Sequence, residues 1–487
     1  MAALFCGSLA AMGHSQRALL IASLLPLAGC GAATVTPASE PAKPLVRVAA
    51  PGAPLPPMPV PYPTAALHGV PDDFPLEPTG TEPFSPDVYR ERRARLLAHL
   101  KSGVAVVFAS KDIREDDEKR QDPDFAYLTG LTHEENAVLL LAPGSADREM
   151  LLLKPSRDET DRWQSYRGGL PSRAIEVRTG FDEVARIDRL PFFALRYARE
   201  SHDRALSLLV GASSLDGPEP QDLELLHKIA ARLPSAPIVD ATGELRAMRM
   251  AKEPRELEKI ARASDITVAA HLEGWRAGKP GMREWDVKRI VEDSFRKSGA
   301  RHFAYGSIVG SGPDGCVLHY PSDDRIIADG DLVLVDAGAE VDHYATDVTR
   351  TFPASGKFTA EQRAVYDVVL RAQKAALAAV HPGVTWRELE AIAKKVIGEA
   401  GYYDFYIHHV GHYVGLEVHD VSSATYLEPI PENAVITIEP GIYIPQKHLG
   451  IRIEDTVVVT KMGHRNLSEK LPREPDDIER WMAGARK

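Results

Sequence analysis

The chain has 487 residues, of which 44% are hydrophobic and 26% are charged, and its formal net charge is -11. This length and composition suit about two globular domains with a tail or linker and exclude a fibrous or broadly disordered chain. The acidic balance and the lack of a Lys/Arg-rich run exclude a nucleic-acid partner, because phosphate neutralisation needs clustered positive charge.

The N-terminus has the pattern of a secretory signal. Arg17 precedes a short apolar run that ends in Leu27-Ala28-Gly29-Cys30 and is too short to span a bilayer comfortably. This ending resembles a bacterial lipobox, so we predict a signal peptide over residues 1–30 and lipidation of Cys30. The protein would then be exported and held at a membrane by the lipid anchor only, facing the periplasm or the cell exterior. The alternative is an ordinary signal peptide that contains a cysteine, and Met12 is a second candidate for the true start.

Residues 31–85 are crowded with Pro and Ala, as in the segment 54–63, and cannot hold a helix or a central strand. We predict an extended, semi-rigid linker that holds the folded part of the chain away from the membrane. A disordered tail without function is the alternative.

An N-terminal α/β domain is predicted over residues 86–246. It opens with an amphipathic helix over 86–98, which Ser85 is placed to cap. Short apolar runs at 104–108 and 137–142 lie between turn signals and are typical of buried strands.

A second domain is predicted over residues 247–472. Apolar residues recur at near-helical spacing over 252–271, which marks its start. Residues 473–487 are left as a C-terminal tail. The predicted fold class is therefore α/β (α+β), with two domains in sequence.

Two carboxylates of the second domain fall on one predicted hairpin. Apolar runs on either side of a polar turn indicate the two strands. If the chain reverses about Val341 and Asp342, Asp336 lies directly opposite Asp347, with Cβ atoms roughly 5 Å apart. A bulge would shift this register.

The same arrangement recurs farther along the chain. Two further apolar runs, reversed about Gln446 and Lys447, set Glu439 opposite Glu454. Four carboxylates within apolar strands are costly to bury unless positive charge lies among them. The two pairs together therefore predict a site for divalent metal.

Each acid alone has a simpler explanation, such as the end of a strand for Asp336 or an ion pair with Arg452 for Glu454. The grouping of all four favours the metal site. A histidine-dense segment over 408–419 supplies a nitrogen ligand, although such clusters also occur as surface patches. The three cysteines form no CxxC pair, which excludes a thiolate zinc site.

At these positions the chain resembles the pita-bread metallopeptidases, in particular the Xaa-Pro aminopeptidases (aminopeptidase P) and the prolidases. The resemblance covers most of the chain after the linker and implies a creatinase/prolidase-like N-terminal domain followed by a pita-bread catalytic domain. The matching motifs are residues 120–130, 307–312 and 318–320, Asp336-Ala-Gly, Asp347-Val-Thr-Arg, the histidine segment, Ile438-Glu-Pro-Gly and Arg452-Ile-Glu-Asp.

The resemblance implies five ligands for two metal ions. These are Asp336, Asp347, His412, Glu439 and Glu454, with Asp347 and Glu454 bridging the ions. A set rich in hard oxygen donors suits Mn²⁺, with Co²⁺, Fe²⁺ and Zn²⁺ as alternatives. The implied nucleophile is a hydroxide shared by the two ions.

The resemblance also assigns catalytic roles. Glu439 would carry a proton from the water toward the leaving nitrogen. His319 and His419 would stabilise the developing oxyanion or donate to substrate, although core packing is the alternative for His319.

Other residues match the family more loosely. His408 matches a histidine that lines the proline pocket, and Arg452 and Asp124 match an ion pair near the metals. His409 departs from the glycine usual in aminopeptidase P, and we expect it to be exposed. We thus expect Glu439, His319, His419 and Arg452 to be catalytic, and His408, His319, His419 and Asp124 to contact substrate.

The expected activity is that of an Xaa-Pro aminopeptidase, which releases the first residue of a peptide whose second residue is proline. The tertiary amide before proline lacks the N–H that ordinary peptidases bind, so a dedicated pocket is needed. A prolidase acting on Xaa-Pro dipeptides is the nearest alternative, and a non-catalytic peptide-binding module is another, which five intact ligands oppose. The resemblance further implies a homo-oligomer, either a dimer or a tetramer.

Overall fold

The computed structural model describes residues 83–100, 103–111, 120–132, 134–143, 149–154, 180–181, 183–200, 206–208, 221–232, 238–421 and 426–486. The predicted signal peptide, the lipidation site Cys30 and almost all of the predicted linker lie outside these residues. Within the described ranges, none of the helices combines the length and the apolar character that crossing a membrane requires.

The N-terminal part of the chain contains a sheet with the strand order β4-β3-β2-β1-β5-β6. Strand β2 is antiparallel to β1 and β3, and the other neighbouring pairs are parallel. The strands are β1 (Val104–Phe108), β2 (Val138–Leu141), β3 (Glu149–Leu153), β4 (Glu183–Arg186), β5 (Leu206–Leu208) and β6 (Ile238–Asp240). The helices are α1 (Pro86–Leu100), α2 (Pro123–Thr129), α5 (Leu190–Glu200), α6 (Gln221–Ala230) and α7 (Thr242–Met250), which leads into the second half of the chain.

Successive residues of β1 point to opposite faces of this sheet, and each face is covered. Ala105 and Val107 pack in one apolar cluster with Leu96 of α1. Val104 and Val106 pack in another cluster with residues of α5 and α6. A sheet buried on both faces explains why its strands are continuous apolar runs, and it confirms the predicted helix and both predicted strands.

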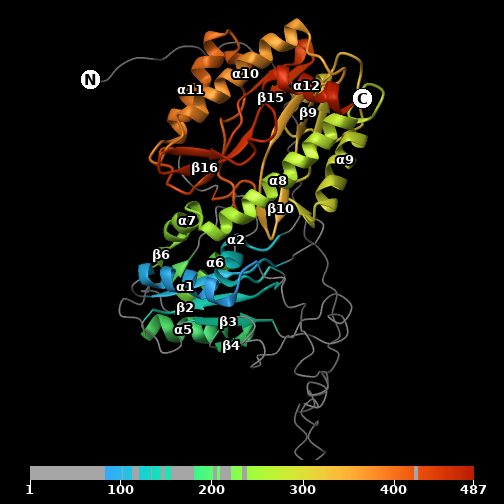
Figure 1. The fold of residues 1–487 in the computed structure, drawn as a ribbon. Helices are drawn as coiled ribbons and strands as arrows, with labels where there is room; N and C mark the ends of the chain where they lie inside the picture. Colours follow the sequence, from blue (N-terminus) through green and yellow to red (C-terminus); the bar gives the residue numbers. More distant parts are fainter. Residues whose placement is uncertain are drawn as a thin grey trace, which may run out of the picture. The chain divides into compact units, whose positions relative to one another are not determined.

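The C-terminal part consists of short sheets flanked by two helix pairs, α8 with α9 and α10 with α11 (Figure 1). The helices are α8 (Pro254–Ala277), α9 (Glu284–Lys297), α10 (Ala360–Ala378), α11 (Trp386–Glu399) and α12 (Pro475–Ala485). The strands are β7 (His302–Phe303), β8 (Ile308–Ser311), β9 (Leu332–Asp336), β10 (Ala339–Val341), β11 (Tyr344–Ala345), β12 (Thr349–Pro353), β13 (Val435–Ile438), β14 (Gly441–Ile444), β15 (Leu449–Arg452), β16 (Asp455–Thr460) and β17 (Gly463–Asn466). They form the sheets β12-β9-β8, β11-β10-β7, β13-β16-β17 and β14-β15.

The predicted C-terminal tail contains a helix that belongs to the core. Ile478 and Met482 of α12 are fully buried, and the ring of Trp481 lies 5.7 Å from the ring of Trp275 in α8. The tail therefore closes one end of the apolar core of this half of the chain.

The register predicted for the first carboxylate hairpin is wrong by two residues. Strand β9 pairs Asp336 with Thr349 of β12, not with Asp347. The chain reverses at Asp342 and His343, which have φ values of 51° and 67° and lie between the paired residues of β10 and β11. Asp347 falls in the irregular segment between β11 and β12, two positions before Thr349.

The register predicted for the second hairpin is confirmed. Ile438 pairs with Asp455, and Gly441 pairs with Arg452, so Glu439 lies opposite Glu454 in the same register. Both acids sit where the ladder is interrupted, because Pro440 has no N–H to continue it. Glu439 therefore lies between β13 and β14, and Glu454 lies between β15 and β16.

Candidate active site

Four carboxylates and a histidine converge in the C-terminal half of the chain. The carboxylates come from the ends and interruptions of the strands described above, and the histidine comes from the segment that runs beside β13. The Thr437 N–H donates to the His412 carbonyl at 2.9 Å, and the Glu439 N–H donates to the Val410 carbonyl at 2.8 Å. The five residues are Asp336, Asp347, His412, Glu439 and Glu454.

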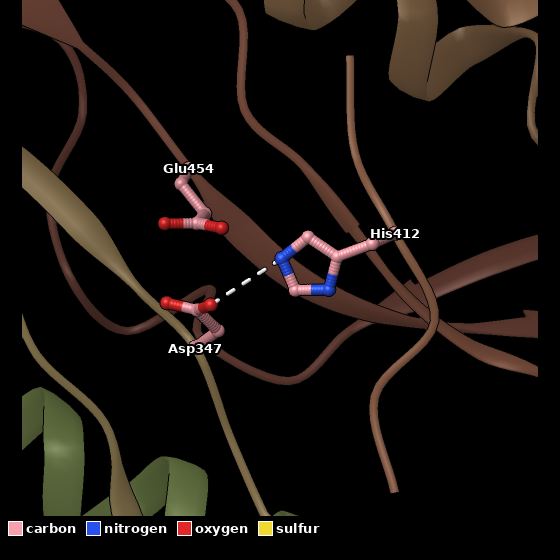
Figure 2. Close-up of side chains that lie close together, drawn as sticks. All are labelled: Asp347, His412 and Glu454. Atoms are coloured by element: carbon pink, nitrogen blue, oxygen red, sulfur yellow. Dashed lines mark ion pairs between the residues drawn. The ribbon is translucent and has the colours of Figure 1, made fainter. Parts of the chain in front are cut away.

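The side chains of this group point toward one another. Nε2 of His412 lies 3.4 Å from Oδ2 of Asp347 and 3.4 Å from Oε1 of Glu439. Figure 2 shows the side chains of Asp347, His412 and Glu454 facing one another. One possible ligand atom from each of the three lies within 4.8 Å of the other two. The Tyr305 hydroxyl hydrogen-bonds Oδ1 of Asp347 and, at 2.5 Å, Oδ1 of Asp336, which ties the fourth carboxylate to the group.

A backbone carbonyl group sets the orientation of the His412 ring. Its Nδ1 lies 3.1 Å from the Tyr413 carbonyl, which can only accept a hydrogen bond, so Nδ1 carries the proton. In the neutral ring, which is the form that binds metal, Nε2 is then the free nitrogen, and it faces the carboxylates. Imidazole ligands of metals are held in this way by a carbonyl or carboxylate on their second nitrogen.

The electrostatics of the site favour a bound cation. Burial and neighbouring carboxylates raise the pKa of Asp347 and the pKa of Glu454 well above their ordinary values. Burial also raises the pKa of Glu439. For Asp336 burial acts in the same direction, but the Arg452 guanidinium and the hydrogen bond from Tyr305 act against burial, and the pKa is lowered. Divalent cations among these groups would stabilise all four carboxylates in their charged form.

The donor set therefore fits divalent metal. Carboxylate oxygens are hard ligands that such ions bind together with a neutral imidazole nitrogen. The side chains of Asp347 and Glu454 are almost fully buried, so water alone cannot stabilise their charges.

Two glycines allow the ligand-bearing segments to approach each other. A Cβ on Gly338 would lie 1.9 Å from the Thr346 carbonyl oxygen, beside Asp347. A Cβ on Gly411 would lie 2.1 Å from the Thr437 carbonyl oxygen, on the strand that leads to Glu439. Both atoms are backbone and cannot move aside cheaply.

Gly338→Ala is therefore expected to push the Asp336 and Asp347 segments apart. We expect a loss of about 1–3 kcal/mol in the free energy of unfolding, as for other overpacked sites. Metal affinity should fall as well, since the carboxylates separate. Chemical denaturation and metal titration of the variant test this, with Gly243→Ala as a control at a glycine that has open space around it. Unchanged metal affinity in a destabilised variant would contradict the explanation.

Arg452 connects the site to its surroundings. Its guanidinium donates to Oδ2 of Asp336, to the Tyr443 hydroxyl at 2.9 Å and to Oγ1 of Thr349 at 3.1 Å. The Thr349 hydroxyl in turn donates to Oε2 of Glu454 at 2.6 Å. Arg452 thus fixes one ligand directly and another through a threonine.

The ion pair predicted between Arg452 and Asp124 is wrong. Asp124 accepts a hydrogen bond from Arg249 at 2.6 Å instead. Arg452, the other member of the predicted pair, forms its ion pair with Asp336. Asp124 and Arg452 each form an ion pair with a different partner, and the order of residues in the sequence does not reveal these partners.

The predicted pocket histidine lies beside the site. Nε2 of His408 is 2.8 Å from the Tyr443 hydroxyl, and its ring is 5.6 Å from the ring of Tyr406. Burial and the nearby Arg452 lower the pKa of His408 to about 3, so the ring is neutral at physiological pH. A neutral imidazole between two tyrosines offers a largely apolar surface.

The other two predicted histidines lie near each other on the exposed side of the site. The His419 ring is 4.3 Å from the His412 ring. Burial, His412 and His319 together lower the pKa of His419 to about 4. His319 is exposed, which excludes the core position considered for it. His409 is also exposed, as expected, with its ring 5.5 Å from that of Tyr426.

Sequence reasoning missed three residues of the site, Tyr305, Thr349 and Tyr443. Tyr305 lies two positions before the 307–312 motif and bonds two predicted ligands. Thr349 and Tyr443 both lie within matching motifs or beside them, but as strand residues they carry no signal that separates them from core positions. Only the folded structure shows that the hydroxyls of Tyr305 and Thr349 bond predicted ligands and that the hydroxyl of Tyr443 bonds His408 and Arg452.

Comparison with known proteins agrees with this geometry. Residues 258–461 match the metallopeptidase family M24, and residues 89–205 match the N-terminal domain of aminopeptidase P. The chain is 32% identical over 444 residues to the Xaa-Pro aminopeptidase of Escherichia coli, covering 82% of this chain and 98% of that protein. The Xaa-Pro dipeptidase of Pyrococcus furiosus is 41% identical over 234 residues, covering 48% of this chain and 66% of that protein.

Solved structures show the same likeness. The structure of a putative aminopeptidase P from Bacillus anthracis superimposes with a TM-score of 0.75 at 29% sequence identity, covering 82% of this chain and 99% of that one. Fold and site together define the class of the protein as a metal-dependent hydrolase, with an aminopeptidase P N-terminal domain before a pita-bread domain. The chain belongs to metallopeptidase family M24, in its aminopeptidase P branch.

Proposed function

We propose that this protein is an Xaa-Pro aminopeptidase, which removes the first residue from peptides that have proline at the second position. The observation that carries the proposal is the convergence of four carboxylates and a histidine in this chain. The chain also matches the Xaa-Pro aminopeptidase of Escherichia coli along 98% of that enzyme's length. A non-catalytic peptide-binding module would have no use for buried carboxylates whose charges need a metal.

The proposed ligands of two divalent ions are Asp336, Asp347, His412, Glu439 and Glu454, with Asp347 and Glu454 shared between the ions. Their oxygen-rich donor set favours Mn²⁺, with Co²⁺, Fe²⁺ or Zn²⁺ as alternatives. When bound, such ions lower the pKa of a water molecule and polarise the peptide carbonyl.

The chain's own side chains would move the protons. Glu439 has a raised pKa because it is buried, which suits a carboxylate that takes a proton from water and passes it to the leaving nitrogen. His419 and His319 are placed on the exposed side of the site, where they can donate hydrogen bonds to a substrate carbonyl.

The pocket for proline would lie against His408. A pyrrolidine ring has no N–H to satisfy and packs favourably on neutral aromatic surfaces. The rings of Tyr406 and Tyr443, with centroids 5.6 and 5.4 Å from that of His408, provide such surfaces.

A prolidase is the second candidate, because 234 residues of this chain align with the Xaa-Pro dipeptidase of Pyrococcus furiosus at 41% identity. The purified full-length chain with Mn²⁺ is to be given an Xaa-Pro-Yaa tripeptide, an Xaa-Pro dipeptide and an Xaa-Ala-Yaa tripeptide, each with and without chelator. We expect chelator-sensitive release of the first residue from the Xaa-Pro-Yaa peptide above all. Cleavage confined to the dipeptide would favour the prolidase, and no chelator-sensitive cleavage of any Xaa-Pro bond would reject both.

We further propose that the protein is exported, lipidated at Cys30 and assembled as a dimer or tetramer. The lipobox-like sequence before Cys30 and the Pro/Ala-rich stretch after it support export. Mass spectrometry of the membrane fraction is expected to find a lipidated Cys30 as the first residue. An unmodified chain that still carries residues 1–29 would reject the anchor, and sedimentation of the purified protein tests the subunit number.

A further inference from the structure

A buried ion cluster lies directly beside His419, and the mechanism above makes no use of it. We call it the Asp420 cluster, and its members are Asp124, Arg249, Lys252 and Asp420. Asp420 accepts hydrogen bonds from Arg249 and, at 3.0 Å, from Nζ of Lys252, whose side chain is 1% exposed while that of Asp420 is 2% exposed. Arg249 donates to Asp124 at 2.6 Å.

The cluster joins segments that are far apart in sequence. Asp124 lies in the first turn of α2, in the aminopeptidase P N-terminal domain, and Arg249 lies in the last turn of α7. Lys252 connects α7 to α8, and its backbone N–H donates to the Asn433 carbonyl at 3.0 Å. Asp420 closes the loop that carries His419.

The loop is shaped to let these charges meet. The Asp420 N–H donates to the Tyr413 carbonyl at 3.0 Å, so the loop folds back on the segment that carries His412. A Cβ on Gly415 would lie 2.1 Å from a carboxylate oxygen of Asp420 and 3.0 Å from Cε of Lys252. Glycine at this position is thus needed for the carboxylate to reach its partners.

Stability is a weak explanation for such a cluster. Removing charges from water is costly, and a well-packed apolar group of similar volume often stabilises a fold as well or better. What buried ion pairs do provide is a fixed geometry, because each charge must keep its partner. The residue whose position follows most directly from that of Asp420 is the preceding one, His419.

His419 itself has little to hold it. Its ring makes no hydrogen bond to any group among the residues that the structure describes, and its closest aromatic neighbour is His412 at 4.3 Å. The backbone on its C-terminal side, fixed through Asp420, is therefore the constraint that places the ring beside the metal site.

We propose that Asp420 is a positioning residue that sets His419 against the metal site, and that Asp124 of the N-terminal domain contributes to the same position through Arg249. This inference rests on the proposed function, which gives His419 its role toward substrate. It also connects the N-terminal domain to the active site through Arg249 and Asp420. Asp124 then has a role other than the ion pair with Arg452.

A double-mutant cycle tests the inference on Xaa-Pro-Yaa cleavage in Mn²⁺. The variants are His419→Ala, Asp420→Asn and the two combined. We expect Asp420→Asn to lower kcat by about 10- to 100-fold with a smaller change in KM, since a displaced catalytic group costs rate. If Asp420 acts through His419, adding Asp420→Asn to His419→Ala should have almost no further effect. Effects that multiply would overturn the proposal.

Asp124→Asn is the second variant, because its side chain is partly exposed and the substitution is compatible with folding. We expect kcat to fall by about 3- to 10-fold, and this effect too should vanish in the His419→Ala background. The matched control is Glu149→Gln, which breaks the buried pair between Glu149 of β3 and Arg93 of α1 at 2.8 Å. It should lower thermal stability and leave kcat unchanged.

A readout independent of activity separates this inference from the proposed function. In the metal-free protein, the rate at which diethyl pyrocarbonate modifies His419 is to be measured by peptide mass spectrometry. We expect this rate to change by at least about threefold in Asp420→Asn and in Asp124→Asn, because the ring is no longer held in its position beside His412. The exposed His381 should react at an unchanged rate. An unchanged His419 rate rejects the positioning role even if the enzyme is active, whereas a wild-type chain that cleaves no Xaa-Pro bond rejects the function alone.

Discussion

Asp347→Asn is expected to abolish metal-dependent cleavage while leaving a folded protein. The substitution removes the carboxylate that lies 3.4 Å from Nε2 of His412 and is hydrogen-bonded by Tyr305. If Asp347 is a ligand as proposed, its loss should lower kcat/KM by about 10³-fold or more, equivalent to about 4 kcal/mol of transition-state stabilisation. Steady-state kinetics on an Xaa-Pro-Yaa peptide measure it.

In the absence of metal, the same substitution should make the folded protein more stable at neutral pH. Burial and like charges raise the pKa of Asp347, so its ionisation destabilises the metal-free fold as pH rises above the pKa of about 4 that it has when unfolded. Asn carries no such charge. We expect metal-free wild type to lose stability between acidic and neutral pH more steeply than the variant.

Bound metal should make wild type more stable than Asp347→Asn. Bound Mn²⁺ at 100 times its dissociation constant stabilises a folded protein by about 2.7 kcal/mol, and only wild type should gain this. Asp342→Asn is the control, because Asp342 is an exposed turn residue and Asn tolerates its positive φ. A variant that is folded, fully active and stabilised by Mn²⁺ like wild type would show that Asp347 is not a ligand.

Asp455→Asn is expected to cause the largest loss of stability. Asp455 is fully buried and lies 2.6 Å from a guanidinium nitrogen of Arg350, whose side chain is also fully buried. It accepts further hydrogen bonds from Gln373, Ser468 and Arg473. Asn keeps the shape but leaves the Arg350 charge without its counter-ion, which costs about 3–5 kcal/mol in buried pairs.

The pH dependence gives this prediction a sign. Arg350 and Arg473 outweigh the effect of burial and lower the pKa of Asp455 to about 2. The stability that its charge contributes is therefore complete above the unfolded pKa of about 4 and is lost as pH falls toward 2. Denaturant unfolding should show that wild type and Asp455→Asn differ most above pH 5 and converge on acidification.

Asp477→Asn is the control for this prediction. It removes an exposed carboxylate that pairs with Arg480, and we expect a change within about 0.5 kcal/mol at any pH. A difference between wild type and Asp455→Asn that stays constant from pH 6 to acid would contradict the assignment of the effect to the Asp455 charge.

The position of Glu439 opposite Glu454 can be predicted from the sequence because two sequence patterns indicate the same register. Pro440 ends the first ladder directly after Glu439, and the turn about Gln446 and Lys447 lies where polar residues interrupt two apolar runs. The ladders on both sides of the interruption keep one register, so counting from the turn places Glu439 opposite Glu454.

The register of the first carboxylate pair is predicted wrongly because its turn has no distinctive residues. Hairpin turns of two residues with positive φ are usually marked by Asn-Gly or Asp-Gly. Here Asp342 and His343 adopt that conformation without glycine, so the sequence pattern predicts a reversal one residue too early, and the predicted register differs from the observed one by two residues. A shift of two keeps side chains on the same face, which is why Asp336 and Asp347 still meet.

Partners across domains were beyond what sequence offers. Asp124 and Arg249 are separated by 125 residues, and no periodicity links them. Tyr305, whose hydroxyl joins two carboxylates, looks like any aromatic residue before a strand. Side-chain positions of this kind depend on how separate elements pack, and the ligand types alone do not determine them.

We propose that the five converging side chains bind the metal that drives Xaa-Pro cleavage. Metal-stripped wild type and Asp347→Asn are to be titrated with Mn²⁺ while bound metal and cleavage of an Xaa-Pro-Yaa peptide are followed together. We predict that the wild-type rate rises from the background with bound Mn²⁺ up to two ions per chain, and that the variant binds less and stays inactive. Full activity of the stripped wild-type protein in excess chelator would contradict the claim.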